Sequence, residues 1–81
     1  MMFSVYAVRD SLLGFGMPLL RDNDAVASRS FEYDINHTDV YNTRPQDYQY
    51  YRIGMFNTET GELVPESPTL IASAIDFIKE K

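Results

Sequence analysis

The residues that most often do chemistry in enzymes are scarce in this chain of 81 amino acids. It has one histidine, His37, and no cysteine. Nucleophilic catalysis needs a base that a third group orients, and the only such pair in the sequence is His37 near Asp39. One histidine without thiolates builds a zinc site only with several carboxylates or across subunits. We therefore predict no catalytic residue, no cofactor and no enzymatic activity.

Acidic residues gather around one predicted helix. They are Asp22, Asp24, Glu32 and Asp34. A two-metal nuclease needs carboxylates that converge from different elements of the fold. A helix cap and a solvated helix face account for all four residues more simply, since Asp24 places negative charge at the positive end of the helix dipole. We predict no metal site here.

The most distinctive chemistry lies in residues 48–56, a run that is rich in tyrosine and contains an arginine. Its aromatic and β-branched residues are typical of a strand, whose side chains alternate between two faces. We expect one face to be buried against helices, formed by Tyr51, Ile53 and Met55. The other face is then open, formed by Tyr48, Tyr50 and Arg52.

Two uses of this open face remain. Aromatic rings can stack on bases of single-stranded nucleic acid, each worth about 1–3 kcal/mol. Tyrosine and arginine are also enriched in protein interfaces. The net charge of −5 opposes binding to a phosphate backbone, so the residues alone favour the interface. If nucleic acid binds, we expect Tyr48, Tyr50 and Arg52 to form the platform. The expected phosphate contacts are Arg44, Arg29, Arg21 and Arg9.

The elements that must position these residues follow from periodicity and turn residues. Alternation over 3–8 predicts a first strand, and 9–17 is a flexible connection with a bend at Gly14-Phe15-Gly16. Pro18–Arg21 is a short second strand at an edge. Asn23 is a candidate helix cap, and the apolar stripe of Ala27, Phe31 and Ile35 predicts a helix that ends near 34–36.

The second half of the chain repeats this order. Residues 37–47 form a loop, and the aromatic strand follows. The turn at 57–61 places Gly61 in the left-handed conformation and leads to a partner strand at 62–64. Ser67-Pro68 is typical of a helix start. The apolar stripe of Ile71, Ala74, Ile75 and Ile78 then predicts a C-terminal helix, with Lys79 and Lys81 complementing the dipole at its end.

The predicted fold class is therefore α+β: a small, mostly antiparallel sheet in the order strand, strand, helix, strand, strand, helix, with the helices on one face. Residues 1–81 form a single domain. A chain of this size buries only roughly 60–65% of its unfolded surface. Since disulfides are excluded, we expect a homo-oligomer to supply the missing apolar burial.

The sequence gives no indication of membrane contact. No apolar run approaches the length that crosses a bilayer, and no basic leader precedes the first apolar stretch. The acidic charge also opposes binding to anionic lipid surfaces. We expect a cytosolic protein.

Several short motifs together resemble one protein family. They are Pro18, the run Asn23-Asp24-Ala25-Val26-Ala27, Arg29 with Phe31, then Tyr51, Gly54, Phe56, Thr60-Gly61, and finally Pro68 before an apolar segment. In this order and spacing the chain resembles the small non-structural protein of gokushovirus-type microviruses, which are tailless phages with single-stranded DNA genomes. The resemblance covers nearly the whole chain.

This resemblance implies a protein of the host bacterial cytoplasm that acts in viral single-stranded DNA synthesis or genome packaging and is often described as DNA-binding. It brings no catalytic residues. In the family segment that contains Asn23, Asp24, Arg29 and Phe31, helix capping, the helix dipole and the core account for the other three residues. Only the side chain of Arg29 is then free to contact a ligand. The resemblance raises single-stranded DNA to rough parity, or slightly above, with the alternative, an oligomeric module that docks on a viral or host protein.

Overall fold

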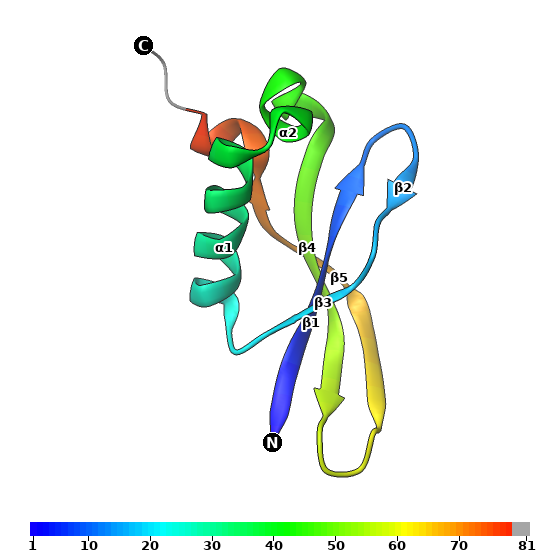
Figure 1. Cartoon of the computed structure of the whole chain (residues 1–81). Coiled ribbons are helices and arrows are strands. Elements are labelled where there is room, and N and C mark those ends of the chain that lie inside the picture. The colour runs from blue at the N-terminus through cyan, green and yellow to red at the C-terminus, as the bar shows by residue number, and fades with distance from the viewer. Residues whose placement is uncertain (79–81) are drawn as a thin grey trace.

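The computed structural model, which describes residues 1–78, confirms the predicted fold class. A five-stranded antiparallel sheet carries the main helix, α1 (Asp24–His37), on one face. In Figure 1 this helix lies beside one end of the sheet, and the β4–β5 hairpin extends beyond it at the other end. The predicted positions of Lys79 and Lys81 fall outside the described residues.

Two long strands form the centre of the sheet. β1 (Met2–Asp10) pairs along its whole length with β4 (Tyr48–Asn57), and β5 (Leu63–Ser73) pairs with the far side of β4. On the other side of β1 lie two short strands, β2 (Gly14–Phe15) and β3 (Leu19–Arg21). The predicted strands are therefore all present, and the bend at Gly14 contributes one more.

Helix α1 follows the local rules of its sequence. The side chain of Asn23 accepts a hydrogen bond from the Val26 amide at 2.9 Å, as expected for an N-cap. Ala27, Phe31 and Ile35 are buried, which confirms the predicted stripe. The helix ends at His37, slightly later than predicted.

The segment 38–47, predicted to be a loop, contains a short helix and a turn of 3-10 helix. These are α2 (Asp39–Thr43) and η1 (Pro45–Asp47). The hydroxyl of Thr43 donates to the Asp39 carbonyl at 2.6 Å, and proline suits the first position of η1 because its missing amide hydrogen is not needed there. Such short helical turns leave no sustained period in a sequence.

The predicted C-terminal helix is wrong. From Ser67-Pro68 the chain continues as β5 to Ser73, and only η2 (Ala74–Phe77) is helical. Thr69 and Leu70 pair with Arg52 and Tyr51 of β4. This pairing over a long sequence distance overrides the local helix signal, and the outer position of β5 tolerates the proline. The turn before β5 is as predicted, with Gly61 at φ 78°.

The core lies between α1 and the sheet and is largely aromatic. The ring of Tyr50 stacks between those of Tyr6 and Phe31, with centroids 5.4 and 4.7 Å away. Ala27, Ile35 and Ala74 complete the buried cluster. Aromatic rings stacked in this way bury large apolar areas.

This core overturns the predicted orientation of the aromatic strand. Tyr50 is only 2% exposed, so the face of Tyr48, Tyr50 and Arg52 is the buried one rather than the open one. The physical reason is the helix that packs on this face, because the Phe31 ring of α1 stacks on the ring of Tyr50. Tyr51, predicted to be core, points to the other side of the sheet.

A β-bulge changes the alternation in the middle of β4. Tyr6 lies opposite Arg52, whereas Val5 lies opposite Gly54, so Ile53 has no partner residue in β1. Even-numbered side chains of β4 therefore face α1 before the bulge and the opposite side of the sheet after it. Gly54 is required there, because a Cβ atom would lie 2.6 Å from the Val64 carbonyl oxygen.

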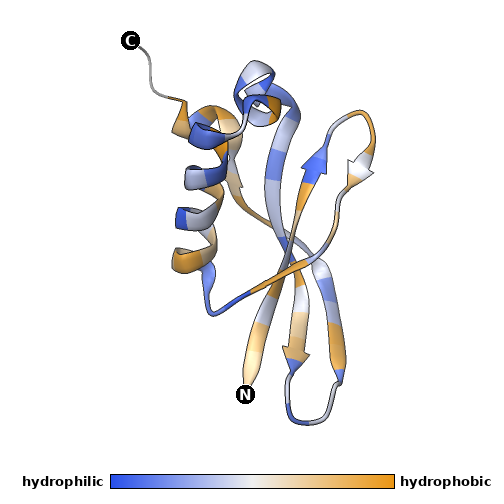
Figure 2. Ribbon diagram, viewed as in Figure 1, coloured by the Kyte–Doolittle hydropathy of each residue, from blue (hydrophilic) through white to orange (hydrophobic). Residues whose placement is uncertain are grey.

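We call the side of the sheet away from α1 the open face. Its members, placed by register, include Val5, Arg9, Phe15, Leu20, Tyr51, Phe56 and Leu63. No other layer among residues 1–78 covers it. In Figure 2 each of the long strands has orange, hydrophobic segments at the hairpin end of the sheet, between more polar ones, although α1 does not reach this end.

Candidate interaction surface

The predicted platform residues lie on the face that α1 covers. Tyr50 is buried, and Tyr48 is half-buried with its ring at 5.0 Å from that of Tyr41. Burial raises the pKa of the Tyr50 and Tyr41 hydroxyls. Tyr48 and Tyr41 line a shallow pocket together with Asp10. This carboxylate opposes a phosphate next to Tyr48.

Arg52 is held by two carboxylates. Its Nη1 donates to Asp24 Oδ2 at 2.6 Å, and its Nε donates to Glu66 Oε1 at 2.7 Å. These hydrogen bonds, first that to Asp24 and then that to Glu66, raise the pKa of Arg52. Its positive charge is thus balanced within the molecule, and it joins the start of α1 to β4 and β5.

Asp24 also forms a hydrogen bond with a side chain of the core. The hydroxyl of Tyr6 donates to Asp24 Oδ1 at 2.5 Å. This hydrogen bond and the nearby Arg52 hold the pKa of Asp24 below its ordinary value. Burial, together with the bond to Asp24, raises the pKa of Tyr6 to about 12. We call Tyr6, Asp24, Arg52 and Glu66 the Asp24 network.

The remaining predicted phosphate contacts are dispersed. Arg44 forms an ion pair with Asp47 at 2.9 Å, and Arg21 donates to the Ser30 hydroxyl and the Leu20 carbonyl. Arg29 is exposed on α1, on the side away from the buried stripe. Arg9 lies on the open face, opposite Phe15 and Gln49. The structure does not gather these arginines into one surface.

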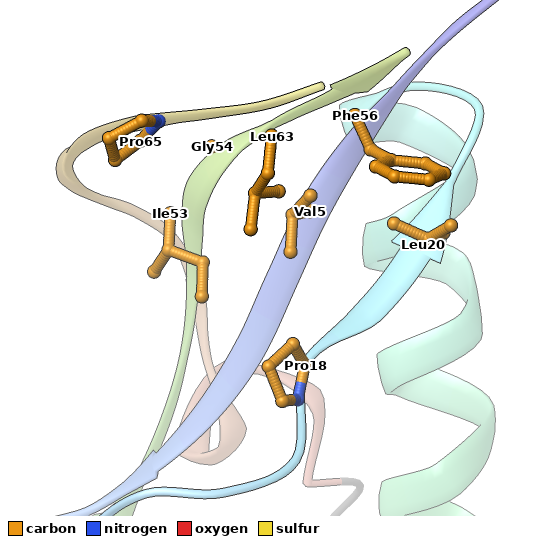
Figure 3. A pocket seen from close by; sticks show the side chains of 8 residues that line it. All are labelled: Val5, Pro18, Leu20, Ile53, Gly54, Phe56, Leu63 and Pro65. Atoms are coloured by element: carbon orange, nitrogen blue, oxygen red, sulfur yellow. The ribbon is translucent and has the colours of Figure 1, made fainter. Parts of the chain in front are cut away.

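The open face carries two features that the sequence analysis missed. The first is an apolar hollow of about 410 Å³ at the hairpin end, which we call the hairpin groove. Figure 3 shows the side chains of Val5, Leu20, Phe56 and Leu63 pointing toward one another across it. Ile53, Pro65, Pro18 and Gly54 complete the lining. None of these residues carries a charge.

The second feature lies further along the same face. The rings of Phe15 and Tyr51 meet edge to face with centroids 5.5 Å apart, and Phe15 is 46% exposed. Arg9 is the register partner of Phe15. We call Phe15, Tyr51 and Arg9 the aromatic end. The sequence signal for both features was present, since β1 and β4 carry apolar residues on both of their faces.

His37 is engaged locally. Its ring lies 3.9 Å from that of Tyr33, and its Nδ1 is 2.8 Å from the Tyr33 carbonyl oxygen. Within residues 1–78, no group of three histidine, aspartate or glutamate side chains could hold a metal ion. In the same part of the chain, none of the helices has the length and apolar character needed to cross a membrane.

Comparison with known protein families gives a match over most of the chain. The family model described as "Phage ORF5 protein" matches residues 3–77, which run from β1 to the end of η2. No curated protein and no solved structure matches this chain.

Proposed function

This chain belongs to the phage ORF5 protein family, and from this premise we propose that it is a non-enzymatic accessory protein that binds another viral or host protein through its open face. Its process is viral single-stranded DNA synthesis or genome packaging in the host bacterial cytoplasm. The resemblance of motifs such as Asn23-Asp24 and Thr60-Gly61 to the gokushovirus non-structural protein supports this role.

The observation that carries the proposal is the uncovered, apolar and aromatic side of the sheet. Interface centres are depleted of charged residues and enriched in aromatic residues and arginine. The aromatic end combines Phe15, Tyr51 and Arg9, and the hairpin groove next to it is wholly apolar. Exposed apolar surface of this kind is typical of protein interaction sites.

The distribution of charge favours a protein over nucleic acid as the partner. The net charge is −5, and Arg52 and Arg44 are paired with carboxylates. A phosphate backbone would have to compete with those carboxylates for both arginines. An apolar protein surface meets no such competition.

The test is co-purification of the tagged chain from phage-infected cells, with nuclease treatment before elution. We expect a specific phage or host protein to remain bound. Phe15→Ala should remove it, because truncating an interface aromatic often costs more than 1 kcal/mol of binding. Tyr33→Ala, on the exposed side of α1, is the control and should retain the partner. A partner that disappears with nuclease, or that both variants retain equally, contradicts the proposal.

Single-stranded DNA is the second candidate, and one observation favours it. The exposed ring of Phe15 and the half-buried ring of Tyr51 lie beside Arg9, an arrangement on which bases could stack. Fluorescence anisotropy with labelled single-stranded DNA should then show binding that weakens as salt increases. Arg9→Ala should weaken it for all sequences and lower the salt slope by about one. Absence of binding at low salt excludes this candidate.

A further inference from the structure

The hairpin groove is an apolar hollow of the open face that neither α1 nor the Asp24 network fills. Its side chains come from four strands, β1, β3, β4 and β5. Val5 at its floor is buried, whereas Leu20 and Leu63 at its rim are 42% and 62% exposed. The occupant of such a site must itself be apolar, since a buried charge or unpaired polar group would find no partner there.

We propose that a second copy of this chain covers the hairpin groove, so that two chains associate face to face. The same patch contains a hollow and, at its rim, the exposed side chains of Leu20 and Leu63, both of which are drawn in Figure 3. A two-fold contact uses one patch on both subunits and requires it to be self-complementary. A leucine of each copy can enter the hollow of the other.

Two copies could instead associate by pairing their edge strands into one continuous sheet, but the edges of this sheet are poorly suited to such pairing. The outer strand β5 contains Pro65 and Pro68, which have no amide hydrogen to donate to a neighbouring strand. The opposite edge consists of the short strands β2 and β3, with Pro18 immediately before β3. Two copies therefore associate through the face of the sheet rather than through its edges.

Size and charge are consistent with a second copy. A standard interface buries about 800 Å² on each partner, which is about 15% of the 5416 Å² surface of this chain (800 of 5416). Each copy carries a net charge of −5, and the groove lining is free of charged side chains. A contact through the groove keeps the acidic residues of the two copies away from its centre.

A small chain without disulfides also gains most from a partner copy, because its own core is limited. The inference does not depend on the proposed function. The aromatic end is displaced along the face, since Arg9 lies four residues, about 13 Å, from Val5 on β1. It remains free for another partner in the dimer.

Light scattering after gel filtration and sedimentation velocity, over a wide range of concentrations, test the proposal. The chain has a mass of 9.3 kDa, so the wild-type protein in solution should have twice this mass. Leu63→Glu and Leu20→Glu should each weaken dimerisation at least about tenfold, because each places a charge in the apolar contact. Val40→Glu is the matched control, because Val40 is also an exposed aliphatic residue (59%) but lies on α2, outside the groove. This variant should leave the dimer intact.

Circular dichroism of each variant shows whether the monomer remains folded, as expected for substitutions at exposed positions. A wild-type chain that is monomeric at every concentration overturns the proposal. So does a dimer that Leu63→Glu and Leu20→Glu weaken no more than Val40→Glu does. Phe15→Ala should stay dimeric while losing the external partner, so failure of this proposal and failure of the proposed function can be distinguished.

Discussion

At the scale of the residue, Asp24 joins helix α1 to the two central strands of the sheet. It begins α1, where its charge is favourable with the helix dipole. Its Oδ1 accepts from the buried Tyr6, and its Oδ2 pairs with Arg52. The sequence predicted only the first of these roles. Arg52, considered earlier as a ligand contact, instead links α1 to β5 through Glu66.

Arg52→Ala should therefore destabilise the protein. It removes two charge-assisted hydrogen bonds and leaves Asp24 without its ion pair. Because Asp24 and Glu66 are partly solvated, we expect a loss of only about 1–2 kcal/mol in the free energy of unfolding. Urea denaturation measures it. Arg29→Ala, which removes an exposed arginine from α1, is the control, and equal losses for both variants would refute a structural role of Arg52.

The Asp24 network also predicts how stability depends on alkaline pH. The pKa of Tyr6 is raised from 10.0 to about 12 in the folded chain, so folding favours the protonated hydroxyl. The resulting stabilisation is complete below pH 10 and is lost as pH rises toward 12. Denaturation at a series of pH values should show this loss. Tyr6→Phe should flatten the dependence without abolishing it, since burial raises the pKa of Tyr41 and Tyr50 as well. An unchanged slope would contradict the assignment to Tyr6.

At the scale of the element, the bulge in β4 determines which side chains share a face. Before it, Tyr50 and Arg52 face α1. After it, Gly54 and Phe56 lie with Val5 on the open face. Regular alternation would instead place all four on one side. The hairpin groove thus exists because the strand contains one extra residue, Ile53, and because Gly54 allows the close approach of β5.

Gly54→Ala should destabilise the sheet at this point. The added Cβ atom meets the Val64 carbonyl oxygen at 2.6 Å, and this backbone atom cannot move without disturbing the pairing of β4 with β5. We expect a loss of about 1–3 kcal/mol. Gly16→Ala is the matched control, since its nearest atom is the Val8 carbonyl oxygen at 3.6 Å, an ordinary contact. Thermal denaturation compares the two, and similar midpoints would argue against a tight bulge.

At the scale of the whole molecule, the shape is elongated, with extents of 46 × 24 × 17 Å. Helix α1 covers one end of the sheet, and the strands of the hairpin end form a single layer (Figure 1). Exposed apolar side chains, Leu20 and Leu63 among them, are the consequence. In the dimer proposed above, the second copy on this face supplies the second layer that a sheet normally needs on its apolar side.

Thermal stability should consequently depend on protein concentration. If two chains bury the hairpin groove together, mass action raises the unfolding midpoint by about 3–5 °C for each tenfold increase in concentration. Differential scanning calorimetry at several concentrations measures this shift. Leu63→Glu should unfold at a lower midpoint than the wild-type chain at the same concentration, and a constant midpoint for the wild-type chain would speak against the dimer.

The sequence by itself determined the α+β class, the Asn23 cap, the stripe of Ala27, Phe31 and Ile35, and the hairpin turn at Gly61. All of these depend on residues close together in the chain, where capping, periodicity and backbone preferences act directly. Only the tertiary structure decided that β5 replaces the predicted helix and that Tyr50 is core. It also created the hairpin groove. These features result from pairing and packing between distant segments, whose energy exceeds the local preferences and leaves no regular period in the sequence.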